Sequence, residues 1–326
     1  MSSIREVANN SGVSIATVSR YLNNDPSLII KDETRKRIDE SVKKLGYKFS
    51  SRKKQYSFGC IMSLTYNYYD PFFTEILAGV QEYCQANNCI IAMIISYEQS
   101  RNLSPAIEKK IQELDGLLVT DETSQNIERL KKLNSNLVFV DCYINNSTVV
   151  GFDHYHANLL LINHLLDAGY RNIAYIGGDS GGEDVEHCVR AIVLREALRI
   201  RNIPYRSEYI YDCHWNPSEV KDCIEDIVQN HPEIDAIFAG SDSVAVAVVN
   251  ILTAFGKKCP DDIAVVGFNG NDIATKHQPS ITTMKLPTFK MGQSAARLLH
   301  KQAQHQNSYN YQILLPVELL KGETSR

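Results

Sequence analysis

The sequence predicts an α/β protein with a small three-helix head and a larger body of two doubly wound parallel-sheet lobes. Three observations carry this prediction. A chain of 326 residues is too long for one ordinary hydrophobic core. The first 47 residues carry apolar side chains at helical spacing. From Phe58 onward, short apolar runs alternate with amphipathic helical stretches, as in parallel sheets covered by helices on both faces.

The head is expected to begin with two short helices joined by a tight turn. Apolar residues at helical spacing begin at Ile4, and the first helix stops at Ser11-Gly12. Gly12 makes the turn. Ser14 then offers an N-cap hydroxyl to a second helix, which runs from Ile15 to Leu22.

A third helix is expected after a break in the chain. Proline lacks an N–H donor and forces its predecessor out of the helical region, so the segment from Asn23 to Pro26 ends the second helix. Asp32 is expected to cap the third helix, which ends at Gly46. One face of this helix carries Ile38, Val42 and Leu45.

The domain boundaries follow from these patterns. Residues 1–47 form the head, residues 48–57 form a polar, basic linker, and residues 58–326 form the body. Within the body, the first lobe is expected to comprise about residues 58–153 and 280–311. The second lobe is expected to comprise about residues 154–279 and 312–326.

The body's strands are short apolar runs, and its helices are amphipathic. The predicted strands are Gly59–Ser63, Cys89–Ile95, Gly116–Thr120, Leu137–Asp141, Asn172–Gly177, Ala236–Gly240 and Ile263–Phe268. The predicted helices include Phe72–Asn87, Ala157–Ala168, Val185–Arg201, Pro217–Gln229 and Ser243–Phe255. In open α/β sheets a ligand lies at the carboxyl ends of the strands, so the loops there are expected to form a ligand cleft.

Charge is distributed unevenly along the chain. Residues 1–55 carry a net charge of +6, whereas the remaining residues carry −10 and bring the total to −4. A basic head on an acidic body indicates that only the head meets a polyanion. The apolar runs are far shorter than a membrane span, and the N-terminus lacks a secretion signal, so we expect a cytoplasmic protein with no membrane partner.

The segment from Gly12 to Arg20 is typical of a helix-turn-helix. Val7, Val13, Val18 and Leu22 are expected to form the seam between the first two helices. The second helix can then enter the major groove of double-stranded DNA with the side chains left on its outer surface. These candidate DNA contacts are Ser14, Ile15, Ala16, Thr17, Ser19, Arg20 and, at the helix end, Asn23. The alternative is an ordinary helical subdomain with a solvated face.

The same residues carry a specific resemblance. The stretch from Ile4 to Asn23 is similar to the signature of the LacI/GalR repressor family, and the similarity extends over essentially the whole chain. It continues at Thr34-Arg35, Leu45–Tyr47, Asn172–Gly178, Ile237–Asp242, Asp262–Phe268 and Pro279–Thr283. The resemblance implies a homodimer or tetramer on a near-palindromic operator. It also implies a periplasmic-binding-protein-like core that closes on an effector, usually a sugar such as a galactoside.

The resemblance also has consequences for base recognition. Ile15 and Ala16 stand at the family's specificity positions; they can touch a thymine methyl group but cannot hydrogen-bond to a base. Family members with a hinge helix carry an Ala-x-x-Leu pattern after the head, which this chain lacks. Tyr56 is the candidate to replace that leucine. Three basic residues are expected to contact phosphates or the minor groove instead: Arg52, Lys53 and Lys54.

Several residues match effector-site positions of the family. Arg190 is expected to bind two sugar hydroxyls, the alternative being a surface salt bridge. Trp215, the only tryptophan, either stacks on a sugar ring or packs in the core. Asp242 either binds ligand hydroxyls or caps a helix, and Asn269 stands where an aspartate is usual. The remaining candidates, for which packing is the alternative, are Tyr68, Asp70, Phe72 and Phe289.

Other classes of function are disfavoured by the sequence. A sugar-binding transport protein would not need the basic head, and an enzyme of the dinucleotide-binding type would carry a GxGxxG fingerprint. No catalytic motif is found, so neither an enzyme nor a cofactor is expected. Cys84 and Cys89 lack the further ligands of a metal site. No leucine heptads follow Gly322, which favours a dimer over a tetramer.

Overall fold

The computed structural model describes residues 2–23, 25, 27–49, 54–62, 71–120, 124–142, 144–178, 184–305 and 309–326. They divide into two compact units, Met1–Gln55 and Tyr56–Arg326. Each unit has its own hydrophobic core, as the sequence predicts. The fold class expected from the sequence, a helical head with a two-sheet α/β body, is confirmed.

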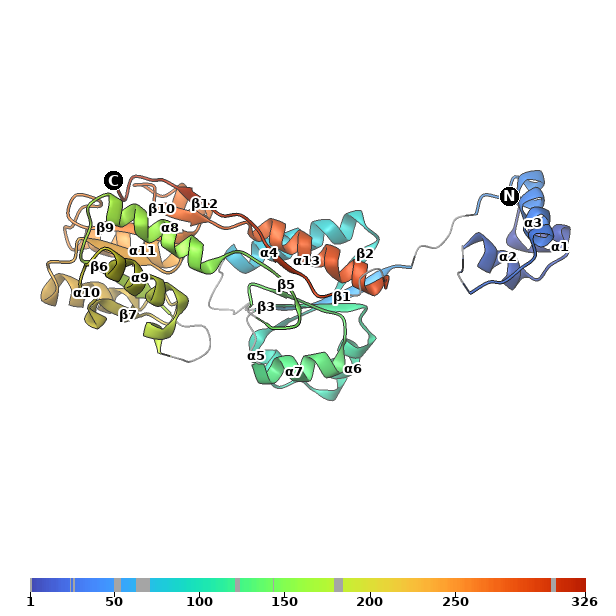
Figure 1. The fold of residues 1–326 in the computed structure, drawn as a ribbon, viewed down its shortest axis with the longest axis horizontal. Helices are drawn as coiled ribbons and strands as arrows, with labels where there is room; N and C mark the ends of the chain where they lie inside the picture. Colours follow the sequence, from blue (N-terminus) through green and yellow to red (C-terminus); the bar gives the residue numbers. More distant parts are fainter. Residues whose placement is uncertain are drawn as a thin grey trace. The chain divides into compact units, whose positions relative to one another are not determined.

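The head consists of α1 (Ile4–Ser11), α2 (Ile15–Leu22) and α3 (Asp32–Leu45), seen at the N-terminal end in Figure 1. Its core is formed by Val7, Ala8, Val18 and Ile38, each at most 2% exposed. Gly12 and Gly46 end α1 and α3 with the left-handed backbone that glycine adopts without a steric cost. Val13 and Leu22, the other two residues of the predicted seam, pack against this core, and α1 and α3 end where the sequence predicts.

One cap in the head differs from the prediction. Asp32 is the first residue of α3, and Lys31, with an extended backbone, occupies the N-cap position without a side-chain hydrogen bond. The Asp32 carboxylate lies instead in the first helical turn, where a negative charge interacts favourably with the helix dipole.

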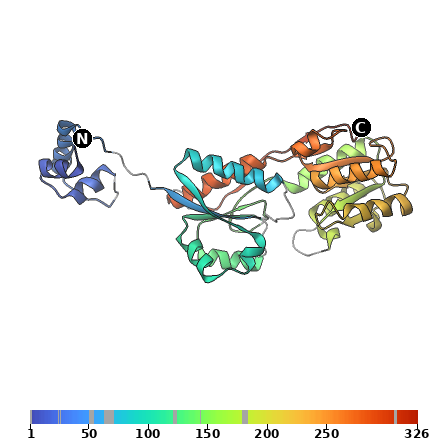
Figure 2. The same ribbon diagram turned by 180° about the vertical axis from the view of Figure 1, so that it is seen from behind.

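The first sheet of the body is entirely parallel, with the strand order β11-β5-β4-β3-β1-β2. Its strands are β1 (Tyr56–Met62), β2 (Cys89–Ser96), β3 (Gly116–Thr120), β4 (Leu137–Val140), β5 (Thr148–Gly151) and β11 (Gln312–Leu314). Figures 1 and 2 show α4 (Pro71–Ala86) and α13 (Thr288–Ala303) side by side along one face of this sheet. Near the other face lie α5 (Tyr97–Arg101), α6 (Pro105–Glu113) and α7 (Ser124–Leu133).

The second sheet has the order β12-β10-β9-β8-β6-β7 and is parallel except for the β10–β12 pair. Its strands are β6 (Ile173–Gly177), β7 (Ile210–Asp212), β8 (Ala236–Ala239), β9 (Ala264–Asn269), β10 (Thr282–Lys285) and β12 (Glu318–Leu320). The accompanying helices are α8 (His154–Asp167), α9 (Val189–Ile200), α10 (Val220–Asn230), α11 (Asp242–Ala254) and the short α12 (Asp272–Thr275). Single 3₁₀ turns lie at Val185–His187 and Ser207–Tyr209.

Alternate side chains of the second sheet point to opposite faces. Tyr175 and Phe238 pack in the core that includes α8 and α9, whereas Ile176 and Ile237 pack in the core that includes α10 and α11. This period of two, with apolar residues on both faces, explains why the strands are continuous apolar runs in the sequence.

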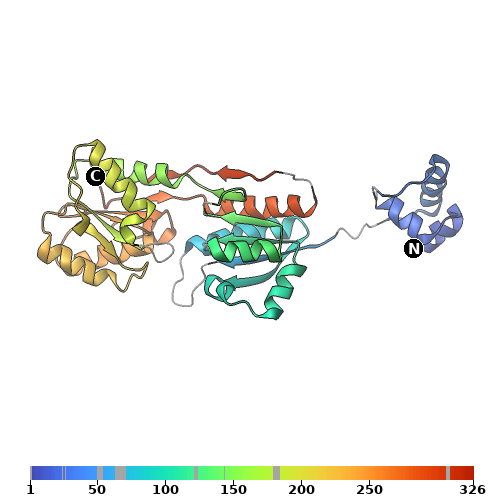
Figure 3. The same ribbon diagram turned by 60° about the horizontal axis from the view of Figure 1, so that its bottom comes forward.

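The chain passes between the two sheets three times: from β5 to α8, from β10 to α13 and from β11 to β12 (Figure 3). The predicted lobe boundaries near residues 280 and 312 are therefore wrong. β10 belongs to the second sheet, because it pairs with β9, and β11 belongs to the first, because it pairs with β5. Strand pairing, rather than the local pattern, decides the lobe of these short segments.

Two predictions about single elements also need correction. Tyr56 does not belong to the linker: it opens β1, and its ring packs against His300 with centroids 4.7 Å apart. The proposed role of Tyr56 as a wedge in DNA is thereby excluded. The predicted helix over residues 185–201 is interrupted at Cys188, which caps α9 by accepting a hydrogen bond from the Ala191 N–H.

Candidate functional site

The outer face of α2 presents short, uncharged side chains at its N-terminus. Ser14 caps the helix by accepting a hydrogen bond from the Thr17 N–H at 3.0 Å, and the two hydroxyls lie 2.8 Å apart. Ile15 is 42% exposed, and Ala16 is exposed beside it. The cap fixes the first turn of the helix and leaves these two apolar side chains pointing into solvent, as expected for contacts with base edges.

The C-terminal half of α2 carries the charged group of this surface. Arg20 is exposed, but its guanidinium is not free: Nε donates to Asp25 Oδ2 at 2.7 Å, and Nη2 donates to Ser27 Oγ at 2.8 Å. The hydrogen bonds from Arg20 and Ser27 lower the pKa of the Asp25 carboxyl to about 2, which favours its charged form. Asn23 and Ser19 close the helix end, since the Asn23 amide donates to the Ser19 carbonyl at 2.8 Å.

The basic linker is only partly described. Arg52 and Lys53 lie outside the residues that the structure describes. Lys54 is described and exposed, and it stands two residues before the start of β1. The contacts proposed for these three side chains therefore rest on the sequence.

In the second lobe, Arg190 lies between two aromatic rings. Its guanidinium carbon is 5.1 Å from the centre of the Trp215 ring and 4.7 Å from the centre of the Phe268 ring. The Nε atom is buried and has no hydrogen-bond partner among the described residues. The alternative of a surface salt bridge does not fit this environment, in which the arginine is oriented by aromatic faces.

Trp215 is positioned by two glycines that follow strands. A Cβ atom at Gly178, just after β6, would lie 2.7 Å from the indole Cδ1. A Cβ atom at Gly240, just after β8, would lie 2.9 Å from the indole Cζ3. The indole therefore lies across the carboxyl ends of two neighbouring strands, the edge at which α/β sheets bind ligands. Trp215 itself has a φ of 56°, a strained backbone for a bulky residue.

Tyr175 of β6, which the sequence analysis did not select, lies close to Gly240, as Trp215 does. Tyr175 is fully buried, and its hydroxyl lies close to the Cys188 thiol. Burial raises its pKa well above the usual value, so the hydroxyl is neutral. A Cβ atom at Gly240 would lie 2.8 Å from this oxygen as well. The apolar run from Asn172 to Gly177 predicts that Tyr175 lies in a buried strand. It does not show that the tyrosine hydroxyl reaches the carboxyl ends of the strands.

Asp242 has a structural position. It is fully buried in the first turn of α11, and the helix is capped by Ser241 instead. Its Oδ2 accepts from the Asn271 N–H and its Oδ1 from the Thr283 hydroxyl, both at 2.6 Å. These bonds connect α11 to the loop after β9 and to β10. The geometry favours this connecting role over both alternatives that the sequence offered.

Two asparagines lie at the carboxyl end of β9: Asn269 is its last residue, and Asn271 follows it. Asn269 is 7% exposed and has a φ of 129°, outside the region that side chains usually adopt. Asn271 is 2% exposed, and neither polar atom of its amide has a hydrogen-bond partner among the described residues. Buried amides without partners are costly, so this loop is poised to bind polar groups or water.

We observe no contact, among the described residues, between Arg190 and the effector-site candidates of the first lobe. Phe72 is 7% exposed and packs in the core, with its ring 5.1 Å from that of Phe73. Phe289 is 40% exposed near the start of α13. Tyr68 and Asp70 lie outside the described residues.

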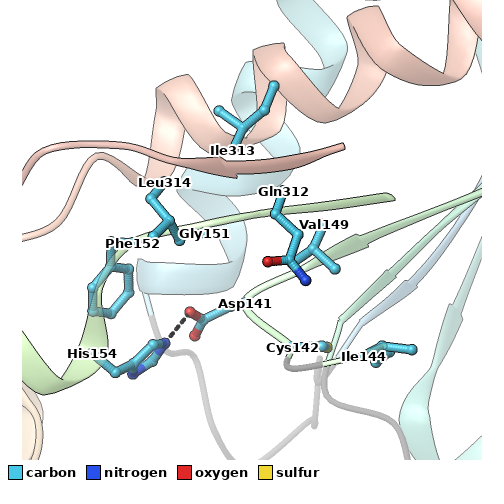
Figure 4. Close-up of a pocket in the computed structure, with 10 residues that line it drawn as sticks. All are labelled: Asp141, Cys142, Ile144, Val149, Gly151, Phe152, His154, Gln312, Ile313 and Leu314. Atoms are coloured by element: carbon cyan, nitrogen blue, oxygen red, sulfur yellow. Dashed lines mark hydrogen bonds and ion pairs between the residues drawn. The ribbon is translucent and has the colours of Figure 1, made fainter. Parts of the chain in front are cut away.

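A polar pair that the sequence did not single out lies where the chain passes from the first sheet to α8. Asp141 follows β4, and His154 begins α8; His154 Nε2 and Asp141 Oδ1 are 2.6 Å apart (Figure 4). Phe152 stacks on the histidine with ring centroids 4.0 Å apart. The pair borders a pocket of about 30 Å³, which holds one or two water molecules but not a sugar. The sequence could have pointed to Asp141, because this residue ends a predicted strand and ligands bind at the carboxyl ends of such strands.

The cysteines offer no metal centre. Burial raises the pKa of the Cys84 thiol to about 12 and that of Cys89 to about 11, so both stay protonated at neutral pH. Within the described ranges, no group of three histidine, cysteine, aspartate or glutamate side chains is placed to hold a metal ion.

Two family models match the chain. Residues 3–50 match the model described as bacterial regulatory proteins, lacI family, and residues 162–325 match the periplasmic binding protein-like domain. The chain thus joins a LacI-family DNA-binding domain to a periplasmic-binding-protein-like domain, and it belongs to the periplasmic binding protein-like family over its body. It is therefore a DNA-binding transcription regulator, with a helix-turn-helix head and a ligand-binding body.

One curated relative is similar to this chain over its full length. The ribose operon repressor of Halalkalibacterium halodurans is 29% identical over 100% of this chain and 98% of its own. Two solved structures share the fold with a TM-score of 0.71. One is the complex of the transcriptional regulator CelR with cellobiose, at 22% identity and full coverage of both chains. The other is the lac repressor dimer bound to operator and the anti-inducer ONPF, at 20% identity over 99% of this chain and 98% of that one.

No helix within the described part of the chain is both long and apolar enough to cross a membrane.

Proposed function

We propose that this protein is a homodimeric transcription repressor whose affinity for a near-palindromic operator is controlled by a sugar. It acts in the cytoplasm and catalyses no reaction. The ribose operon repressor and the cellobiose complex of CelR support the sugar class. The lac repressor dimer on its operator supports the dimer.

The observation that carries the effector proposal is the placement of Arg190 between Trp215 and Phe268. A sugar offers vicinal hydroxyl oxygens that accept hydrogen bonds from a guanidinium, and apolar ring faces that pack on aromatic side chains. Asn269 offers both donors and acceptors nearby. Asp141 of the first lobe is an additional candidate contact, because it too follows the carboxyl end of a parallel strand.

Regulation follows from differential binding. A sugar that contacts both lobes only when they are closed stabilises the closed body, and the operator affinity changes by the resulting coupling free energy. The DNA side of the coupling uses Ser14, Ile15, Ala16, Thr17 and Arg20 on α2, together with the basic linker.

A two-stage experiment tests the proposal. Duplexes of random sequence are enriched on the purified protein, and the selected duplex is used in retardation assays with ribose, cellobiose and galactosides. We expect a near-palindromic duplex and release by at least one sugar. The same sugar should raise the thermal stability of the protein, by about 2.7 kcal/mol at 100 times its Kd.

The two halves of the proposal fail in different ways. Enrichment of no preferred duplex would contradict the assignment as a sequence-specific regulator. A selected operator that responds to nucleobases or phosphorylated metabolites, and to no sugar, would overturn only the sugar class.

A further inference from the structure

A closed hydrogen-bond network surrounds the charged residue of α2. Arg20 Nε donates to Asp25 Oδ2 at 2.7 Å, and Arg20 Nη2 donates to Ser27 Oγ at 2.8 Å. Ser27 in turn donates to Asp25 Oδ1 from its hydroxyl at 2.7 Å and from its N–H at 2.9 Å. Both carboxylate oxygens and the serine hydroxyl are thus used to hold one guanidinium.

The backbone ties this network to the helix. The Asp25 N–H donates to the Arg20 carbonyl at 3.0 Å, and the Leu28 N–H donates to the Asp25 carbonyl at 3.0 Å. The side chains of Arg20 and Asp25 keep exposures of 47% and 29%, so the network lies at the surface, beside the exposed face of α2. The partners of Arg20 therefore have a fixed position relative to the helix that carries it.

The network leaves one edge of the guanidinium available. Arginine has five N–H donors, and Nε and Nη2 form its side edge. Because Asp25 and Ser27 occupy that edge, the remaining donors are those of Nη1 and one of Nη2, which together form the end of the fork. This end is the part that can donate to two acceptors of one guanine in the major groove.

Charge alone does not explain Asp25. Its carboxylate stands on the face that meets a polyanion, where a negative charge weakens binding to every phosphate. It is ionised at neutral pH, as an aspartate ordinarily is, and hydrogen bonds from Arg20 and Ser27 lower its pKa further. An exposed ion pair also contributes little to stability. A benefit to DNA recognition from orienting Arg20 would offset the repulsion between the Asp25 carboxylate and the phosphates.

We propose that Asp25 and Ser27 are positioning residues that set sequence discrimination by the head. They fix Arg20 with the end of its fork toward the base edges, and Asp25 neutralises its charge so that phosphates of any sequence attract it less. This inference rests on the proposed DNA-binding function and adds the residues that make the arginine selective.

The test compares affinity for the selected operator with affinity for an unrelated duplex, at one salt concentration. We expect Asp25→Ala to lower the ratio of the two affinities about tenfold, because affinity for the unrelated duplex stays equal or rises while operator affinity falls. Ser27→Ala keeps the carboxylate and should lower the ratio less. Asp32→Asn is the matched control: it removes an exposed carboxylate elsewhere in the head and should change both affinities in parallel.

A double-mutant cycle separates positioning from structural damage. In the Arg20→Ala background, Asp25→Ala should leave the affinity ratio unchanged, since no guanidinium remains to be oriented. Circular dichroism of each full-length variant checks that the head is folded. A ratio that Asp25→Ala leaves intact, or a loss of equal size in the Arg20→Ala background, would overturn the proposal. A parent protein without any sequence preference would instead contradict the proposed function.

Discussion

Arg190 is oriented by the faces of Trp215 and Phe268, while its Nε stays buried without a partner among the described residues. An unsatisfied buried donor destabilises the protein that carries it. Such a cost is typical of functional sites, where an interaction is reserved for a ligand. The residue is thus prepared for acceptor atoms that the protein itself does not supply.

This environment makes a prediction that separates binding from folding. Arg190→Met keeps a long side chain between the rings but removes all donors. We expect sugar affinity to fall by about 1.5–3 kcal/mol, the range for hydrogen bonds to charged groups. The thermal stability of the ligand-free protein should not fall, because a buried unpaired donor has been removed.

Calorimetry with the best sugar and thermal unfolding without ligand measure the two quantities. Arg199→Met, on the exposed side of the same helix, is the control and should leave sugar binding unchanged. Normal sugar affinity in Arg190→Met would show that the arginine has no contact with the effector.

The sequence identified Arg190 and Trp215, but it could not show that they touch. Their contact depends on the strained backbone at Trp215 and on glycines after two strands, which bring together segments far apart in the chain. The same limit applies to Asp242, whose partners Asn271 and Thr283 come from other elements. Residue types and positions were predictable, whereas pairings that depend on tertiary structure were not.

At the scale of elements, α4 and α13 make an unusually close contact. A Cβ atom at Gly292 would lie 1.9 Å from the Ile76 carbonyl oxygen, and one at Gly79 would lie 2.0 Å from the Phe289 carbonyl oxygen. Each glycine thus allows the backbone of the other helix to approach. The contact holds the C-terminal helix of the first lobe against its first helix.

We therefore expect Gly292→Ala to destabilise the body. The added methyl group meets backbone rather than a flexible side chain, so the helices must separate, at a cost of about 1–3 kcal/mol. Urea unfolding monitored by tryptophan fluorescence and circular dichroism measures the change. Gly151→Ala is the control, since the atoms nearest to a Cβ at that position lie 3.9 Å away. Equal stability of both variants would contradict the close contact.

Long buried strands and helices were predicted with ends close to those observed, because a continuous apolar run identifies a strand covered on both faces. Five strands were missed. The edge strands β7, β11 and β12 have three residues each and are partly exposed, so they lack such a run. β5 and β10 are buried but have only four residues each, and threonine and glycine shorten their apolar runs. The break before α9 was missed for another reason. Its N-cap is Cys188, a residue type outside the usual Ser, Thr, Asp and Asn set.

For the whole molecule, the charge distribution predicts how salt acts. The +6 head and linker carry the attraction to DNA, and the body carries −10. Replacing Arg52, Lys53 and Lys54 with Gln should flatten the slope of log affinity against log salt concentration, by up to about 0.9 for each phosphate that is no longer neutralised. Filter binding at several salt concentrations measures the slope.

The control removes the same amount of charge from the body. Lys109, Lys110 and Lys258 are exposed, and replacing all three with Gln should leave the slope unchanged. If the linker variant has the slope of the parent, its three cations do not contact phosphates.

The proposed dimer requires a surface on the body, and β2 offers one. It is an edge strand of the first sheet, and Ile90, Ala92 and Ile94 point to solvent along it, with exposures of 42% for Ile90 and 44% for Ile94. An exposed apolar edge strand is a template for pairing, which proteins normally block with charges. No charged residue interrupts this strand. A second copy of this chain that packs against β2 would bury Ile90, Ala92 and Ile94.

The double variant Ile90→Lys, Ile94→Lys should therefore be monomeric by light scattering at concentrations at which the parent is dimeric. Its operator affinity should fall by at least tenfold, because a dimer engages two half-sites and gains from the effective concentration of its second head. Sugar binding should persist, since Arg190 lies on α9 beside the second sheet, away from β2 of the first sheet. Ile200→Lys, which charges an exposed isoleucine at the end of α9, should leave the oligomeric state unchanged. A double variant that stays dimeric would place the interface elsewhere on the body.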